Sequence, residues 1–271
     1  SPGCHPEGPA RPPLQGIAYF VRLHVAFHPS LLATGSQPPV SPTRPQVCVV
    51  VDVMRASTTI ITFLERGASC IYVASGIEAA RVGAASIRGA VLAGELDGVA
   101  PPGFDYGNSP VEVSAAEIEG RAVIFATTNG TVAIRAVEGL GPVFIGALRN
   151  AGAVADEAAA SARDEACDLT IICAGREGSF GVDDAYCAGA LADRLLAGGS
   201  FDLTDGAEAA LRLYRSEPDA RALFTRSAAG RNIMRLGLTP DIDYCAESDA
   251  STIVPRLGRE LRMLDDGGAD R

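Results

Sequence analysis

The chain has 271 residues, of which 47% are hydrophobic and 21% are charged, a composition typical of a folded globular protein rather than a disordered one. With 23 basic and 33 acidic side chains the formal net charge is −10, which argues against nucleic acid or an anionic membrane as the main partner. All basic residues are arginine and the histidines end at His28, which excludes a Schiff-base lysine, a Walker A lysine and, beyond that point, a Ser-His-Asp triad.

From Arg22 onward, short β-rich runs alternate with Ala-rich helical stretches. The predicted strands are residues 22–27, 47–53, 70–74, 90–93, 121–126, 143–147 and 168–173. The predicted helices are residues 58–66 and 77–88, a short helix after Thr131, and residues 151–166 and 182–197, while residues 204–236 are mainly helical. Strands and helices that alternate through short connections predict an α/β fold, a mostly parallel sheet with helices on both faces and a helical C-terminal part.

The expected domain organisation follows from where this alternation begins and ends. Residues 1–20 are expected to form a disordered extension, residues 21–257 one α/β domain, and residues 258–271 a polar tail; a helical subdomain over residues 201–240 is an alternative division. No apolar stretch approaches the ~20 residues that span a bilayer, and no secretory signal is recognisable. The seven cysteines lack a C-x-x-C pair, so we expect free thiols and a cytoplasmic location.

Polar residues gather where the predicted strands end. The segments concerned are residues 52–59, 93–95, 103–110, 127–131, 149–150 and 175–184. In open α/β sheets the carboxyl ends of the strands form the edge that binds ligands, so we expect these segments to meet there.

The first of these segments has the features of an anion site. Ser57 and Thr58 open a predicted helix just after Arg55, so their hydroxyls, the free backbone N–H groups and the guanidinium can surround a phosphate. N-capping of the helix by Ser57 is the structural alternative.

A second turn repeats this composition, and a third segment adds a cation. The predicted phosphate contacts in the second turn are Thr127, Thr128, Asn129 and Thr131. Arg176, in a Gly-rich loop at the same edge, is a further predicted anion contact.

Five carboxylates at this edge are candidate ligands for Mg²⁺, which prefers oxygen donors. They are Asp52, Glu95, Asp105, Asp183 and Asp184. Because Mg²⁺ usually takes one or two carboxylates together with water and substrate phosphate, the others are expected to cap helices or lie on the surface.

Taken together, these segments resemble the 2-phosphosulfolactate phosphatase family. The motifs are VVDVMRASTT (50–59), GE (94–95), GFDYGNSP (103–110), TTNGT (127–131), NA (150–151), DD (183–184), AG (188–189), Gly237, DID (241–243) and CA (245–246). The likeness covers residues 22–257, and Asp183 stands where the family is expected to have glutamate.

The resemblance implies that residues 21–257 are a Mg²⁺-dependent phosphatase domain. The implied reaction hydrolyses 2-phosphosulfolactate to sulfolactate and phosphate, as in coenzyme M biosynthesis, with a small anionic phospho-acid as partner. From the residues themselves we assign catalytic roles to Asp52, as metal ligand or base, and to Arg55, as the group that neutralises the phosphate. Direct attack by water bound to the metal is favoured over an aspartyl-phosphate, because Asp52 lacks the Asp-x-Asp pattern.

Two other functions are kept as alternatives. One is a phosphatase of another small 2-phospho-hydroxy acid, and the other is a non-catalytic anion-binding protein. A second anion cluster, for which Arg149 and Arg176 are candidates, would favour the sulfonated substrate. We expect Arg55→Ala to reduce turnover without disturbing the fold. Homo-oligomerisation is left open by the sequence.

Overall fold

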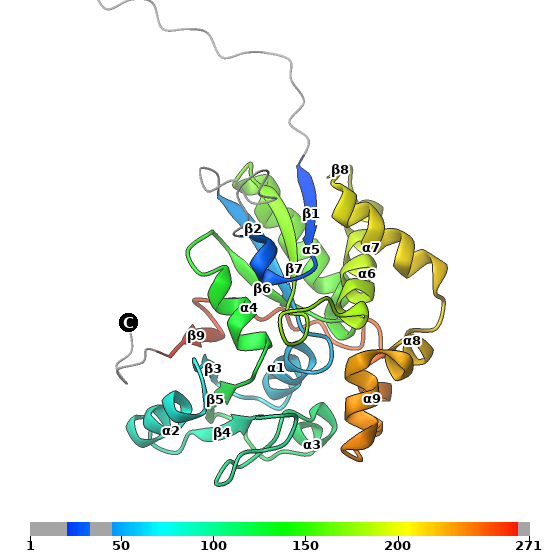
Figure 1. Cartoon of the computed structure of the whole chain (residues 1–271). Coiled ribbons are helices and arrows are strands. Elements are labelled where there is room, and N and C mark those ends of the chain that lie inside the picture. The colour runs from blue at the N-terminus through cyan, green and yellow to red at the C-terminus, as the bar shows by residue number, and fades with distance from the viewer. Residues whose placement is uncertain (1–20, 33–44, 265–271) are drawn as a thin grey trace, which may run out of the picture.

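The computed structural model describes residues 21–32 and 45–264, which form two parallel sheets surrounded by helices (Figure 1). The first sheet contains β1 (Arg22–Ala26), β2 (Gln46–Val51), β6 (Val143–Gly146), β7 (Asp168–Cys173) and β8 (Asp202–Leu203). The second contains β3 (Cys70–Val73), β4 (Val91–Gly94), β5 (Ala122–Ala126) and β9 (Leu261–Met263). The extension expected over residues 1–20 lies outside the described residues.

The helices follow the strands in the expected alternation. They are α1 (Ala56–Glu65), α2 (Ile77–Ser86), α3 (Pro110–Ser114), α4 (Gly130–Ala136), α5 (Ala151–Asp164), α6 (Val182–Gly198), α7 (Asp205–Ser216), α8 (Ala220–Arg226), α9 (Ala228–Arg235) and α10 (Pro240–Cys245), with short 3₁₀ helices η1 (Pro29–Leu32) and η2 (Leu148–Asn150). The predicted α/β class and the helical C-terminal part are therefore confirmed.

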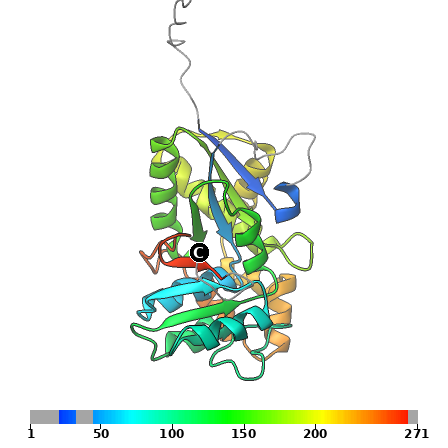
Figure 2. The same cartoon turned by 90° about the vertical axis from the view of Figure 1, so that its left-hand side faces the viewer.

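The strands divide between two sheets, whereas the sequence predicted one. The strand order is β6-β2-β7-β1-β8 in the first sheet and β4-β5-β3-β9 in the second, and all pairings within them are parallel. The chain leaves the first sheet through α1, builds β3, β4 and β5, and returns with β6. Figures 1 and 2 show the sheets one above the other. Alternation along the chain predicts the elements but not which strands pair.

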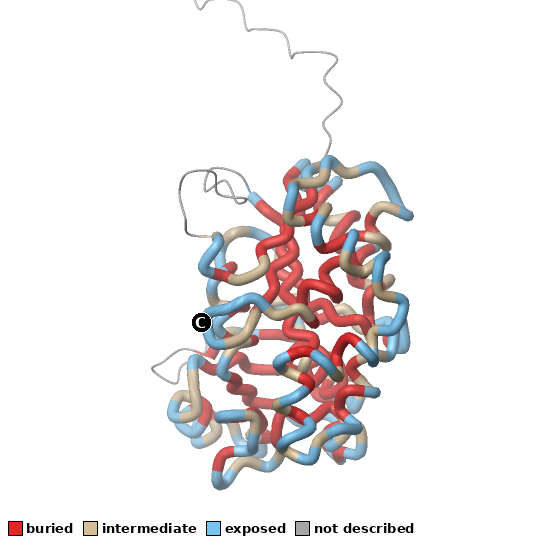
Figure 3. The backbone as a smooth tube through the Cα atoms, turned by 45° about the vertical axis from the view of Figure 1, so that its right-hand side comes forward, coloured by how far each residue is buried: buried red, intermediate tan, exposed pale blue. Residues whose placement is uncertain are grey.

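Strand β2 is buried on both faces, which explains its uninterrupted apolar sequence. Val47, Val49 and Val51 pack in a core with α5, α6 and α7, while Cys48 and Val50 pack in a core that joins the two sheets through α1. Figure 3 shows buried segments in the middle of both the upper and the lower part of the molecule. This central position fixes the segment that follows β2, where Asp52 and Arg55 lie.

The C-terminal region is tied into the fold more closely than the sequence suggests. Residues expected to form a polar tail include β9, which pairs with β3 and places Leu261 in the core between the sheets. Helix α7 packs tightly on α6, because a Cβ atom on Gly189 would lie 2.1 Å from the Ala210 carbonyl oxygen.

The structure also bears on the expected state of the cysteines and on membrane-spanning helices. The six cysteines of the described residues are free thiols, as predicted, and five of them are buried. Among the described helices, none combines the length and apolar character that crossing a membrane requires.

Candidate active site

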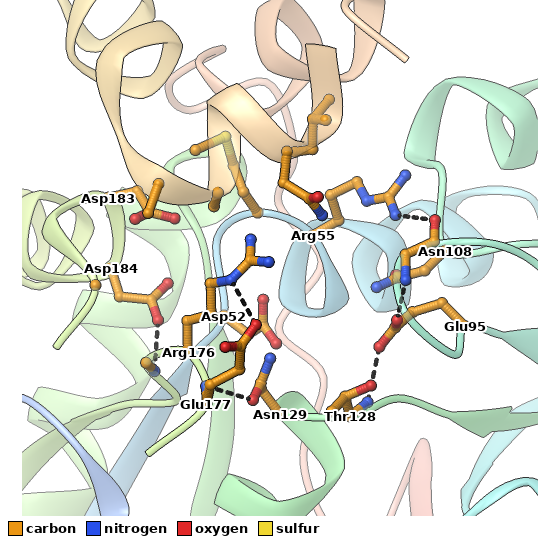
Figure 4. Close-up of a pocket in the computed structure, with 18 of the residues that line it drawn as sticks. Asp52, Arg55, Glu95, Asn108, Thr128, Asn129, Arg176, Glu177, Asp183 and Asp184 are labelled. Atoms are coloured by element: carbon orange, nitrogen blue, oxygen red, sulfur yellow. Dashed lines mark hydrogen bonds and ion pairs between the residues drawn. The ribbon is translucent and has the colours of Figure 1, made fainter. Parts of the chain in front are cut away.

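The carboxyl ends of strands from both sheets meet at one cavity of about 530 Å³ (Figure 4). Segments after β2, β4, β5 and β7 line it, together with the start of α6 and one face of α9. The structure thereby brings together these predicted site residues: Asp52, Arg55, Glu95, Thr128, Asn129, Arg176, Asp183 and Asp184.

The remaining predicted phosphate contacts lie outside the lining of the cavity. The Ser57 hydroxyl accepts the Asp52 backbone N–H at 2.9 Å, and the Thr58 hydroxyl donates to the Val53 carbonyl at 2.9 Å. Thr127 and Thr131 bond to each other's backbone, at 3.3 and 2.7 Å. These hydroxyls shape the two turns instead of facing the cavity, which is the structural alternative for such residues.

Asp105, a predicted metal ligand, is also outside the cavity. Its side chain is exposed and accepts the Leu92 backbone N–H at 2.8 Å. The carboxylate therefore helps to hold the long loop against β4, a role for which Asp is common in loops.

Two carboxylates inside the cavity connect its segments. Glu95 accepts backbone N–H groups from Gly98 and Thr128, both at 2.7 Å, and so joins the loop after β4 to the turn after β5. Asp184 accepts those of Val53 and Gly175, at 2.8 and 2.9 Å, and joins the segments after β2 and β7. Each carboxylate uses both oxygens in charge-assisted hydrogen bonds that position backbone.

Arg55 is held by a buried ion pair that sequence analysis missed. Its guanidinium donates to Asp241 of α10 at 2.9 Å and to the Gly98 carbonyl at 2.9 Å, and the two charged side chains are only 5% and 1% exposed. Asp241 also accepts the Ser109 hydroxyl at 2.6 Å. The expectation that Arg55→Ala leaves the fold undisturbed does not fit this burial, because its loss leaves Asp241 as an unpaired buried charge. The DID motif contains Asp241, but nothing in the sequence indicates its distant partner.

Crowding of carboxylates sets the electrostatics of the cavity. Burial raises the pKa of Asp52 from 3.8 to about 7, with further contributions from Glu95 and Asp183. Burial likewise raises the pKa of Asp183 to about 6, and burial together with Asp183 and Asp52 raises the pKa of Asp184 well above its ordinary range. A cavity of this kind favours protons or a cation.

Hydrogen-bond donors and cations lie beside these acids. Arg176 is about one-third exposed and contacts the exposed Glu177 at 3.2 Å. The Asn129 side-chain oxygen accepts the Glu177 backbone N–H at 3.4 Å, which leaves its amide NH₂ on the Asp52 side (Figure 4). Asn108 belongs to the predicted 103–110 segment but was not predicted as a site residue; it is buried in the lining, and its side-chain oxygen has no hydrogen-bond partner among the described residues.

Arg149, the other candidate for a second anion cluster, does not reach the cavity. It donates to Glu65 at 3.1 Å, forms an ion pair with Glu247, and lies 4.3 Å from the centre of the Tyr244 ring. The structure instead adds Asn232 and Arg235 of α9, which sequence analysis did not single out.

The buried ion pair predicts strong coupling in a double-mutant cycle. Arg55→Ala and Asp241→Ala should each lower the free energy of unfolding by about 3–5 kcal/mol, because each leaves an uncompensated buried charge. The double variant should lose less than the sum of the two, measured by denaturant unfolding. The exposed pair Arg212–Glu208 is the control, and Arg212→Ala should cost less than about 1 kcal/mol. Additive losses at Arg55 and Asp241 would contradict the pairing.

The raised pKa of Asp52 predicts a pH-dependent stability in chelator-treated, metal-free buffer. Between pH 3.8 and about 7 the folded protein binds more protons at Asp52 than the unfolded chain, so this group lowers stability as pH rises. The free energy of unfolding of Asp52→Asn should therefore be higher than that of wild type at pH 8, by on the order of 2–4 kcal/mol. This difference between the two proteins should shrink toward pH 4.

Denaturant unfolding at pH 4, 6 and 8 measures this effect. Asp105→Asn, a change at an exposed carboxylate outside the cavity, is the control and should keep the wild-type dependence on pH. A difference between Asp52→Asn and wild type that stays constant across this range would show that Asp52 is not protonated above its ordinary pKa.

Comparison with known proteins identifies the family to which the chain belongs. Residues 35–260 match the sequence model of a family described as 2-phosphosulpholactate phosphatase. The chain is 44% identical to a probable 2-phosphosulfolactate phosphatase of Deinococcus radiodurans and 42% identical to one of Thermus thermophilus, each over 79% of this chain and 88% of the relative. A protein of the same description from Symbiobacterium thermophilum is 39% identical over 80% of this chain and 94% of its own length. The chain therefore belongs to the 2-phosphosulfolactate phosphatase family, a family of phosphoric monoester hydrolases.

Proposed function

We propose that this protein hydrolyses 2-phosphosulfolactate to sulfolactate and inorganic phosphate in a Mg²⁺-dependent reaction. The observation that carries the proposal is one cavity that combines buried carboxylates of raised pKa with arginine and amide donors. The matching family and the names of the relatives support this substrate. The proposal includes a place in coenzyme M biosynthesis, which the family resemblance implies, and a cytoplasmic location.

The donors in the cavity fit a magnesium ion that keeps much of its water. In the described part of the chain, no group of three or more acidic, histidine or cysteine side chains is gathered as a ready-made metal site. Mg²⁺ commonly uses only one or two carboxylates with water and substrate phosphate, so such a group is not required. Glu95 and Asp184 are engaged by two backbone N–H groups each, which leaves Asp52 and Asp183 as the residues that would hold the ion.

The ion would also relieve an electrostatic cost. Asp52 and Asp183 are buried near each other and both have raised pKa values, so a divalent cation stabilises their ionised forms. When bound, Mg²⁺ neutralises charge on the phosphate oxygens and makes water easier to deprotonate.

The protein's own groups can carry out the remaining steps. Asp52, which a bound cation would keep ionised, lines the cavity and can accept a hydrogen bond and then a proton from the attacking water. Arg176 and the Asn129 amide can donate to the phosphate oxygens as the new P–O bond forms and the bond to the substrate's 2-oxygen breaks. Arg55, fixed by Asp241 and Gly98, keeps its guanidinium in the lining of the cavity in a position that does not need to change during the reaction.

Of the two alternatives, the non-catalytic anion-binding protein fits the cavity less well. A protein that only bound anions would not be served by Asp52, Glu95, Asp183 and Asp184, because uncompensated carboxylates repel an anion. A phosphatase of another 2-phospho-hydroxy acid would share the acidic part of the cavity and would differ in the residues that contact the rest of the substrate.

Phosphate release from 2-phosphosulfolactate tests the proposal. We expect wild-type turnover with Mg²⁺ that stops on addition of excess chelator, and a loss of about 10²–10⁴-fold in kcat for Asp52→Asn, the range typical of a removed general base. Asp105→Asn, outside the cavity, should retain the wild-type rate.

The same reaction separates the alternatives. No phosphate should remain on the protein after an acid quench, whereas phosphate trapped on Asp52 would contradict direct attack by water. Turnover that persists in chelator would refute the metal dependence, and faster release from 2-phospholactate than from 2-phosphosulfolactate would favour the other substrate class.

A further inference from the structure

Helix α9 forms a wall of the cavity that differs in chemistry from the acidic part. Ala228, Ala229, Asn232, Ile233 and Arg235 line the cavity from this helix, and none of them is acidic. The two alanines leave room in front of the helix, while the amide and the guanidinium can donate hydrogen bonds. In Figure 4 the α9 ribbon lies across the cavity from Asn129 and Thr128.

Arg235 differs from the other arginines that line the cavity. Arg55 forms an ion pair with Asp241, and Arg176 forms one with Glu177. Within residues 21–32 and 45–264, Arg235 has no carboxylate partner; its guanidinium donates to the side-chain oxygen of Asn232. It is therefore the lining arginine whose charge no carboxylate of the described residues matches.

This contact fixes which end of the Asn232 amide faces the cavity. Because the oxygen accepts from Arg235, the NH₂ group is directed away from that arginine. A Cβ atom on Gly98 would lie 3.4 Å from the Asn232 side-chain nitrogen and 3.9 Å from a terminal nitrogen of Arg55. The Asn232 NH₂ group and the Arg55 guanidinium therefore flank the same glycine.

The proposed substrate has a strong acid group that needs such donors. A sulfonate is ionised throughout the neutral range and presents three oxygen acceptors, so it is poorly placed beside Asp52, Asp183 and Asp184. The exposed Asp97 and Glu177 also line the cavity, and solvent screens their charge as it screens that of the exposed Arg235. The α9 wall supplies positive charge and N–H donors across from the buried acids.

We propose that Arg235 and Asn232 bind the sulfonate of the substrate and so determine specificity for sulfonated over non-sulfonated 2-phospho acids. This inference rests on the proposed function, because it assigns the residues that bind the sulfonate group of that substrate. Arg235 contacts the sulfonate and orients the Asn232 amide toward it, while hydrolysis takes place at the acidic part of the cavity.

Steady-state kinetics on two substrates test this assignment. The substrates are 2-phosphosulfolactate and 2-phospholactate, which has the same ester and carboxylate but no sulfonate. Arg235→Gln should lower kcat/KM for the sulfonated substrate by about ten-fold or more, as expected for loss of one charge-assisted hydrogen bond, mainly through KM. The effect on 2-phospholactate should be less than about two-fold, because uniform binding of the shared groups is unchanged.

Two further variants make the test specific. Asn232→Asp places a negative charge at the same position with little change in size and should reduce kcat/KM for the sulfonated substrate further. Arg231→Gln removes an arginine of the same helix that does not line the cavity, and it should alter neither substrate's kinetics.

The outcomes distinguish failure of the sulfonate assignment from failure of the proposed phosphatase function. Equal losses on both substrates for Arg235→Gln, or no loss on either, would overturn the assignment while leaving the phosphatase function intact. A wild-type protein that releases phosphate from neither substrate would overturn the proposed function and the assignment with it.

Discussion

The active cavity depends on holding several carboxylates out of water where the two sheets meet. Burial of these charges is unfavourable and raises the pKa values of Asp52 and Asp183, and at Asp52 the neighbouring carboxylates of Glu95 and Asp183 raise the pKa further. The fold tolerates it because backbone N–H groups already engage Glu95 and Asp184. Asp52 accepts the Ala56 backbone N–H at 3.3 Å, yet its pKa and that of Asp183 stay raised, so a cation bound between them would be stabilising.

The same carboxylates also explain how distant segments are aligned. Glu95 and Asp184 join the loops after β4 and β5 and those after β2 and β7, so each sheet has one bridge between its own strand ends. The connection from β2 to the other sheet is made by Arg55, which contacts Gly98 after β4 and Asp241 of α10. Some acidic residues of the cavity therefore position its backbone segments, while their neighbours are left for the proposed reaction. Catalysis by fixed charges requires such a pre-organised site.

Much of this arrangement is predictable from the sequence, because local patterns determine it. The apolar run of β2 and the polar residues after it predict both a central strand and a ligand-binding edge at Asp52. Patterns of this kind do not reveal strand pairing, so the division into two sheets was not predicted. Sequence patterns also do not show which group a hydroxyl contacts. Ser57 and Thr131 lie in segments whose residues are typical of an anion site, but their hydroxyls form hydrogen bonds with the backbone. Asp241 and Arg235 lie in the C-terminal helices far along the chain, and only the fold shows that Asp241 approaches Arg55 and that Arg235 lines the cavity.

Mg²⁺ binding linked to proton release is the most direct measure of the central claim, that buried carboxylates of raised pKa form the cation site. Calorimetric titration at pH 6.5 in buffers of different ionisation enthalpy gives the number of protons released as the ion binds. The account predicts release from wild type at pH 6.5, less at pH 8.5, and a marked reduction in both affinity and release for Asp52→Asn, because ligation requires the ionised carboxylate. Binding without proton release at pH 6.5, or unchanged binding by Asp52→Asn, would contradict it.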